Sequence, residues 1–87
     1  MSAGGLAAIR DTARAYVRCL EVRRIARREL LDAQEYRACS DTSEARTELM
    51  HAETDYRRAV RDARIQLARL ERLLAIEPRT LRMEKEP

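Results

Sequence analysis

One histidine and its acidic neighbours form the only group in this sequence whose spacing suits a metal ion. His51 is the single histidine, with Glu48 three residues before it and Asp55 four residues after it. On a helix this spacing puts the three side chains on one face. Structural metal centres use about four ligands in a closed arrangement, so one exposed helix face is a weak pattern. We therefore interpret His51 as a surface or seam residue and expect no metal, no cofactor and no catalytic residue.

The two cysteines are too far apart to form a disulfide bond. Cys19 and Cys39 lie on one predicted helix, about 30 Å apart at a rise of about 1.5 Å per residue. Bridged cysteines have Cα atoms within about 7 Å of each other. We expect free thiols, with Cys19 acting as a small apolar residue and Cys39 exposed at a turn. Free thiols favour a reducing, cytoplasmic compartment.

Patterns typical of enzymes and of membrane proteins are missing from the sequence. The spacing of the Ser, His and Asp residues does not indicate a catalytic triad, and the sequence has no phosphate-binding loop and no CxxC motif. The first residues lack a basic start followed by an apolar segment, so we expect no signal peptide. No apolar run has the length of a membrane span. We expect a non-enzymatic protein that does not associate with membranes.

The composition is typical of helices. Phe and Trp are absent, three tyrosines are the only aromatic residues, and Gly and Pro occur twice each. Alanine, leucine, arginine and glutamate, which are good helix formers, dominate the rest. Between Leu6 and Glu77 only the polar run at 39–43 interrupts this composition. A core without large aromatic side chains is difficult to build in so short a chain.

The stretch from 43 to 76 carries the clearest helical pattern. Its apolar residues alternate in steps of four and three, with Gln66 as the one polar member. We call this line of residues, which we expect to face a neighbouring helix, the seam. A seam over about four heptads is typical of a helix that packs along another helix. Small seam residues allow two backbones to approach closely, so we expect a tight helix pair. The seam residues are Ala45, Leu49, Ala52, Tyr56, Ala59, Ala63, Leu70 and Leu73.

The first half of the chain shows a similar pattern that shifts around the helix. Apolar residues spaced by three and four run from Leu6 to Leu20, and arginines including Arg23 then take the next places. The apolar positions continue about a third of a turn away, from Cys19 to Ala33. We therefore expect this helix to contact more than one neighbour. Arginine stems can lie along apolar surface with their charged ends in water, so the helix is not interrupted.

These patterns predict an all-α fold, an antiparallel two-helix hairpin that resembles a coiled coil. Short polar side chains in the connection compete with the helix by bonding to the local backbone. Asp41, Thr42 and Ser43 supply capping groups, and Pro78 ends the second helix. The expected segments are a flexible N-terminus at 1–5, a hairpin at 6–77 with helices 6–38 and 44–77 around a turn at 39–43, and a charged C-terminal tail at 78–87.

A second apolar stripe lies beside the seam of the second helix. Val60, Leu67 and Leu74 recur every seven residues, and one partner helix cannot readily cover both stripes. Surplus apolar surface usually marks an interface. We therefore expect the hairpin to complete a four-helix bundle, as a homodimer or by docking on another protein. The residues expected at this interface are Val60, Leu67, Leu70, Leu74, Val22 and Leu30.

Charge divides the predicted hairpin into an acidic tip and a basic shaft. Residues 29–55 hold eight acidic residues and two arginines, which gives a net charge of −6. Because the whole chain carries +3, the residues outside this range carry +9. In a hairpin, residue i lies beside about 82 minus i, which places 18–28 beside 54–64. The arginines of the shaft are Arg23, Arg24, Arg27, Arg28, Arg57, Arg58, Arg61 and Arg64.

Three interpretations of this charge pattern are open. The charges can be solvated helix faces with pairs inside each helix. They can also direct self-assembly, with the acidic tip of one copy beside the basic shaft of another. The third interpretation is a polyanion-binding face for nucleic acid. The sequence has no helix-turn-helix turn, no Gly-rich loop and no aromatic stacking platform for that role.

The sequence predicts a protein-interaction module, such as an adaptor, a chaperone or an inhibitor, that presents a helical face to a protein target. The target is a second copy, a different protein, or both. The alternative is a small RNA- or DNA-binding regulator that uses the arginine-rich face of a hairpin dimer. The modest net charge of +3 favours the first interpretation.

Overall fold

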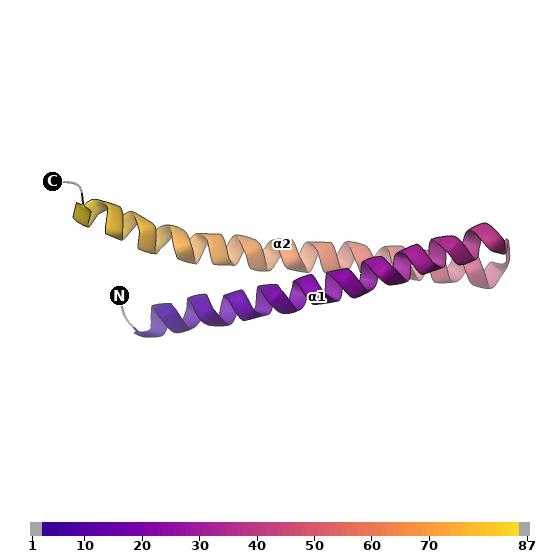
Figure 1. The fold of residues 1–87 in the computed structure, drawn as a ribbon, viewed down its shortest axis with the longest axis horizontal. Helices are drawn as coiled ribbons and strands as arrows, with labels where there is room; N and C mark the ends of the chain where they lie inside the picture. Colours follow the sequence, from indigo (N-terminus) through magenta and orange to yellow (C-terminus); the bar gives the residue numbers. More distant parts are fainter. Residues whose placement is uncertain (1–2, 86–87) are drawn as a thin grey trace.

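The protein is a pair of long antiparallel helices joined by a short turn (Figure 1). The structure, a computed structural model, describes the backbone of residues 3–85 and the side chains of residues 5–75. Helix α1 spans Ala3–Cys39 and helix α2 spans Ser43–Lys85. The molecule measures 67 × 23 × 13 Å. The predicted all-helical class and the packed helix pair are confirmed.

Both helices extend beyond the bounds that the sequence pattern predicts. α1 begins at Ala3 rather than at residue 6, and α2 continues through Pro78 to Lys85. The predicted stop before Pro78 is therefore wrong, and 78–85 belongs to α2. Proline removes one backbone donor and crowds the carbonyl four residues earlier, which weakens or bends a helix but need not end it. The outermost parts of the predicted terminal segments, residues 1–2 and 86–87, lie outside the described residues.

The turn consists of Ser40–Thr42 and lies inside the predicted 39–43. Thr42 caps α2, because its Oγ1 accepts a hydrogen bond from the Ala45 amide at 3.1 Å. The Thr42 carbonyl also accepts the first helical hydrogen bond, from the Arg46 amide at 3.1 Å. At the end of α1 the Ser40 amide donates to the Tyr36 carbonyl at 2.9 Å. These local bonds satisfy backbone groups that helix ends leave free.

Alanine fills the contact between the two helices. Among the side chains that the structure describes, every buried one is an alanine. All four alanines of the seam predicted in α2 are buried, and Ala45 is fully covered. A methyl group at each contact lets the backbones approach closely, as the seam pattern predicts. The buried residues are Ala26, Ala33, Ala45, Ala52, Ala59 and Ala63.

The buried stripe of α1 does not shift around the helix, which corrects the prediction from apolar positions. Half-buried positions recur every seven residues from Ile9 through Tyr16, Arg23 and Leu30. Arg23 thus lies in the stripe and not beside it. An arginine can hold a seam position because its apolar stem packs while its guanidinium reaches water. Counting only apolar residue types hides this continuity.

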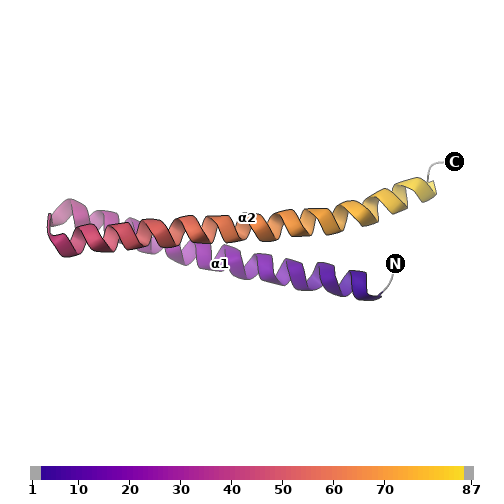
Figure 2. The ribbon, with the colours of Figure 1, turned by 180° about the vertical axis from the view of Figure 1, so that it is seen from behind.

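The helices lie close together near the turn and diverge toward the chain ends (Figures 1 and 2). Burial follows the same trend. All the buried alanines lie in the half of the hairpin nearer the turn, where Leu30, Leu49 and Tyr56 are half-buried. In the other half the described seam residues are at most half-buried, among them Ile9, Tyr16, Leu70 and Leu73. The open end therefore leaves apolar seam residues incompletely covered.

Residues that line a common groove define the register of the pair. Ala33 lies with Ala52, and Ala26 lies with Ala59. Residue i therefore lies beside 85 minus i, whereas the centre of the turn predicts about 82 minus i. The shift is three residues, close to one helical turn, and it aligns the seam alanines of the two helices. Residues 18–28 consequently lie beside 57–67 and not beside 54–64.

Candidate functional site

The seam leaves two lateral sides of the hairpin uncovered, and their residues differ in charge. One side, here the groove side, contains residues of both helices that line shared grooves. On α1 these include Val22, Glu29 and Tyr36, which are seven residues apart and so share one flank of the seam. On α2 they include Glu48 and Asp55, also seven apart.

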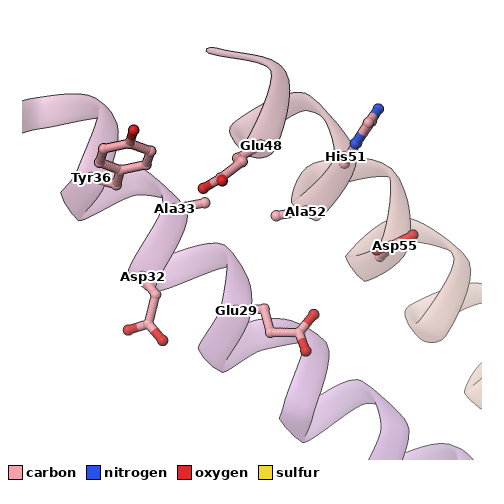
Figure 3. A pocket seen from close by; sticks show the side chains of 8 residues that line it. All are labelled: Glu29, Asp32, Ala33, Tyr36, Glu48, His51, Ala52 and Asp55. Carbon is pink, nitrogen blue, oxygen red and sulfur yellow. The ribbon is translucent and has the colours of Figure 1, made fainter. Parts of the chain in front are cut away.

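A groove of about 460 Å³ lies on the groove side near the turn, and we call it the acidic groove. Its floor is made by buried Ala33 and Ala52, which face each other between the helices (Figure 3). Within the described residues, none of its carboxylates forms an ion pair. Its lining residues are Glu29, Asp32, Ala33, Tyr36, Glu48, His51, Ala52 and Asp55.

His51 lies at the edge of the acidic groove. Its side chain is exposed, and Figure 3 shows the imidazole directed away from α1. Among the described residues, no group of three or more His, Cys, Asp or Glu side chains is arranged to hold a metal ion. Glu48, by contrast, extends toward α1 (Figure 3). The carboxylates of this groove therefore present negative charge to an approaching molecule.

A second groove, of about 410 Å³, continues the same side toward the middle of the hairpin. Val22 and Ile25 line it, and both remain more than half exposed at 56% and 51%. Ala26 and Ala59 form its floor, and Arg58 is its only basic lining residue. The groove side thus combines an acidic region near the turn with an apolar region beside it.

The opposite flank of the seam carries arginine and larger apolar residues, and we call it the arginine side. Leu20 and Arg27 define it on α1, and Val60, Leu67 and Leu74 define it on α2, each set at seven-residue spacing. Val60 and Leu67 are half-buried, whereas Leu74 is 43% exposed. Other exposed apolar residues at positions next to this flank are Val17, Leu31 and Met50. Four of the predicted shaft arginines lie on this side: Arg24, Arg27, Arg57 and Arg64. Arg46 and the acidic Glu53 precede Val60 on the same flank at the same seven-residue spacing.

The residues predicted for the interface do not form one continuous surface. Leu30 and Leu70 are half-buried in the seam between the two helices. Val60, Leu67 and Leu74 share the arginine side. Val22 lies on the groove side and lines the second groove. The structure thus divides the predicted interface into the intramolecular seam and two opposite sides.

The arginines predicted as one face surround the hairpin. Arg23 is half-buried in the seam, and Arg58 lines the second groove. Arg28 and Arg61 lie on the backs of the helices, away from the seam. Arg28 adjoins the arginine side, because it lines a pocket on α1 with Arg24 and Arg27. The predicted arginines that the arginine side itself holds are Arg24, Arg27, Arg57 and Arg64. Of these, Arg24 is paired with Glu21 at 2.6 Å, and the other three form no ion pair within the described residues.

The acidic groove was not predicted from the sequence as a site. Glu48 and Asp55 were considered as candidate metal ligands with His51, and all four acidic residues, with Glu29 and Asp32, were otherwise counted only as part of the net charge over the tip. A signal was present, because Glu48 and Asp55 recur at the seven-residue spacing of a seam flank and Glu29 and Tyr36 do the same. Assigning these flanks to the same side requires the register of the two helices.

Comparisons with protein-family models, with curated proteins and with solved structures give no match to the chain. Neither α1 nor α2, over the described residues, contains an apolar stretch that could span a membrane. Cys19 is a half-buried free thiol and Cys39 an exposed one. The candidate site therefore consists of two opposed lateral surfaces, and their function must be argued from their own chemistry.

Proposed function

We propose that the chain is a non-enzymatic protein-interaction module whose hairpin presents its lateral sides to helices of a protein target. The observation that supports this proposal is the absence of any fully buried large side chain among the described residues. Exposed apolar surface on this scale is typical of interfaces. The large apolar residues that remain exposed are Leu6, Val17, Val22, Ile25, Leu31, Tyr36, Met50, Ile65 and Leu74.

Burial energetics favour completion by further helices. Burying a methyl or methylene group stabilises a fold by about 0.8 kcal/mol, and burying a whole leucine side chain by about 1.5–3 kcal/mol. The hairpin buries alanines and leaves its leucines, valines and isoleucines in contact with water. Additional helices packed on its sides, as in a four-helix bundle, would cover these side chains. A second copy or a different helical protein can supply them.

The proposal includes a reducing, cytoplasmic location, since Cys19 and Cys39 are free thiols. Adaptors, chaperones and inhibitors all fit this description, because each acts by covering a surface of another protein. The lateral sides of the hairpin are long and shallow, and this shape suits a helix laid along them.

A capture experiment from the native cell tests the proposal. The bait is the intact chain, compared with Leu67→Glu/Leu74→Glu and with a control, Arg61→Glu/Ala68→Glu, on the back of α2. We expect defined protein partners, or a second tagged copy, to remain with the parent and the control after nuclease treatment and to be lost from the leucine variant. Equal recovery with all three baits, or no protein partner at all, contradicts the proposal.

Nucleic-acid binding is the second candidate, favoured by the arginine side. Arg27, Arg57 and Arg64 are not neutralised by ion pairs within the described residues. However, Val60 and Leu67 lie between them, and phosphate contacts draw on charged and polar groups. Recovery of nucleic acid alone, with loss of every protein after nuclease, would favour this candidate.

A further inference from the structure

Unneutralised charges of opposite sign predominate on the two sides of the hairpin, with Arg58 on the groove side and Glu53 on the arginine side as exceptions among the flank residues. On the groove side Glu29, Asp32, Glu48 and Asp55 form no ion pairs among the described residues. On the arginine side Arg27, Arg57 and Arg64 also form none. The ion pairs that do form lie at the turn or between near neighbours in one helix. Both surfaces are therefore free to pair with an external partner.

Each charged surface adjoins exposed apolar residues. Beside the acidic groove, Val22 and Ile25 line the second groove of the same side. Among the arginines, Val60 and Leu67 provide half-buried apolar surface. A docking surface that combines apolar contact with complementary charge gains both affinity and orientation.

We propose that the arginine side of one copy docks on the acidic groove and the adjoining apolar groove of a second copy. Unlike sides of neighbouring hairpins then meet, an arrangement that we call face to back. This inference rests on the proposed interaction function and names its partner. The unneutralised arginines then meet the unneutralised carboxylates, and Leu67 lies near Val22 and Ile25. The centres of the two charged surfaces are roughly 10 Å apart along the helix axis at the rise of a helix, so neighbouring copies are staggered.

Symmetry distinguishes this arrangement from an ordinary two-fold dimer. In a two-fold dimer the same surface meets itself. Contact between two arginine sides would bring Arg57 and Arg64 close to the arginines of the other copy, which outnumber Glu53 on that flank. Contact between two acidic grooves would bring carboxylates together. Such like-charge contacts are unfavourable. A face-to-back contact avoids them and covers exposed apolar residues on both sides of every internal copy.

A face-to-back contact does not close on two copies. It yields a ring if the rotation between copies closes and an open series if it does not. We therefore expect the mean mass in solution to rise with protein concentration, beyond that of a dimer. Salt should lower it, because exposed charges are screened over about 10 Å at about 0.1 M salt.

Charge reversal tests the contact on the full chain. The arginine variant is Arg57→Glu/Arg64→Glu, and the groove variant is Glu48→Arg/Asp55→Arg. The matched control is Arg14→Glu/Arg61→Glu, which changes one charge on the back of each helix. Circular dichroism checks that each variant is helical, and sedimentation or light scattering from micromolar to millimolar concentration measures association at low and high salt.

We expect each reversal variant to associate at least about tenfold more weakly than the parent, and the control to associate like the parent. An equal mixture of the two reversal variants should regain association, because each contact then again joins opposite charges. A chain with all four substitutions should also associate, with the charges exchanged. This restoration separates the contact from a general effect on folding.

Three results would overturn the inference. The first is a fixed dimer whose mass does not respond to either reversal. The second is a monomer under every condition. The third is a pair of reversal variants that remain monomeric when mixed although both are helical. None of these decides the proposed function, because the capture experiment with Leu67→Glu/Leu74→Glu detects other protein partners independently.

Discussion

Arg46 donates two hydrogen bonds to one carboxylate oxygen of Asp41, from Nε at 2.9 Å and from Nη2 at 2.7 Å. The same oxygen lies 3.1 Å from Nη1 of Arg37, near the end of α1. Asp41 therefore links the end of α1 to the start of α2 across the turn. This cluster also neutralises the acidic residue that lies in the turn itself. The carboxylates near the turn that form no ion pair within the described residues therefore lie on the helices, and those of the acidic groove are among them.

Replacing Asp41 should destabilise the hairpin modestly. We expect Asp41→Ala to lower the free energy of unfolding by about 0.5 kcal/mol at low salt, because the ion pairs are mostly exposed. The difference from the parent should shrink in high salt. Urea unfolding followed by circular dichroism measures it. Glu71→Ala, at an exposed residue with no ion pair among the described residues, serves as the control, and an equal loss there would contradict the role of Asp41.

The cap of α2 gives a second prediction. Thr42→Ala removes the side-chain acceptor for the Ala45 amide and should cost about 1 kcal/mol of stability. Thr42→Asp keeps an acceptor and should lose little. Thr54→Ala is the matched control, because Oγ1 of Thr54 only donates to the Met50 carbonyl at 3.0 Å within the helix. A similar loss in Thr42→Asp and Thr42→Ala would show that the hydroxyl does not act as a cap.

The alanine seam predicts a strong dependence on side-chain size. Ala59→Leu should destabilise the hairpin by about 1–3 kcal/mol, because the added volume forces the helices apart. Ala68→Leu, on the exposed back of α2, should have little effect. Thermal unfolding of both variants provides the comparison. A higher melting temperature for Ala59→Leu would mean that the seam is not closely packed.

Arg23 occupies a seam position that an apolar residue would fill better. Arg23→Leu should raise the free energy of unfolding by about 1 kcal/mol, since polar residues at seam positions lower stability. Arg28→Leu tests the same substitution on the exposed back of α1 and should not stabilise the chain. Chemical unfolding measured on both variants decides the matter. Destabilisation by Arg23→Leu alone would show that the guanidinium supports the fold.

Several features of the fold were predictable because they depend on neighbouring residues of one helix. The seven-residue spacing of Ala45, Ala52 and Ala59 predicts one buried stripe whatever the partner is. The capping and turn residues act within a few positions of the chain, so the site of the turn could also be predicted. The continuation of α2 past Pro78 could not, because proline weakens a helix without specifying whether it ends.

The candidate surfaces were less predictable. The seven-residue spacing placed Val60, Leu67 and Leu74 together beside the seam, and the predicted interface also included Val22, which lines the second groove on the other side. The eight arginines were likewise treated as one face. Which flank of α1 lies beside which flank of α2 depends on the relative rotation and shift of both helices, and a count of charges along the chain does not contain that relation.

By itself the sequence determined two helices, the turn between them and an alanine seam, because helical periodicity and local hydrogen bonding belong to single segments of chain. The tertiary structure decided the register, the continuous stripe of α1 through Arg23 and the separation of charge onto two sides. These follow from how the alanines of both helices interlock, which aligns the helices about one turn away from the position that the turn predicts. That alignment places Glu29 and Asp32 with Glu48 and Asp55 around the acidic groove and leaves Arg27, Arg57 and Arg64 on the opposite side.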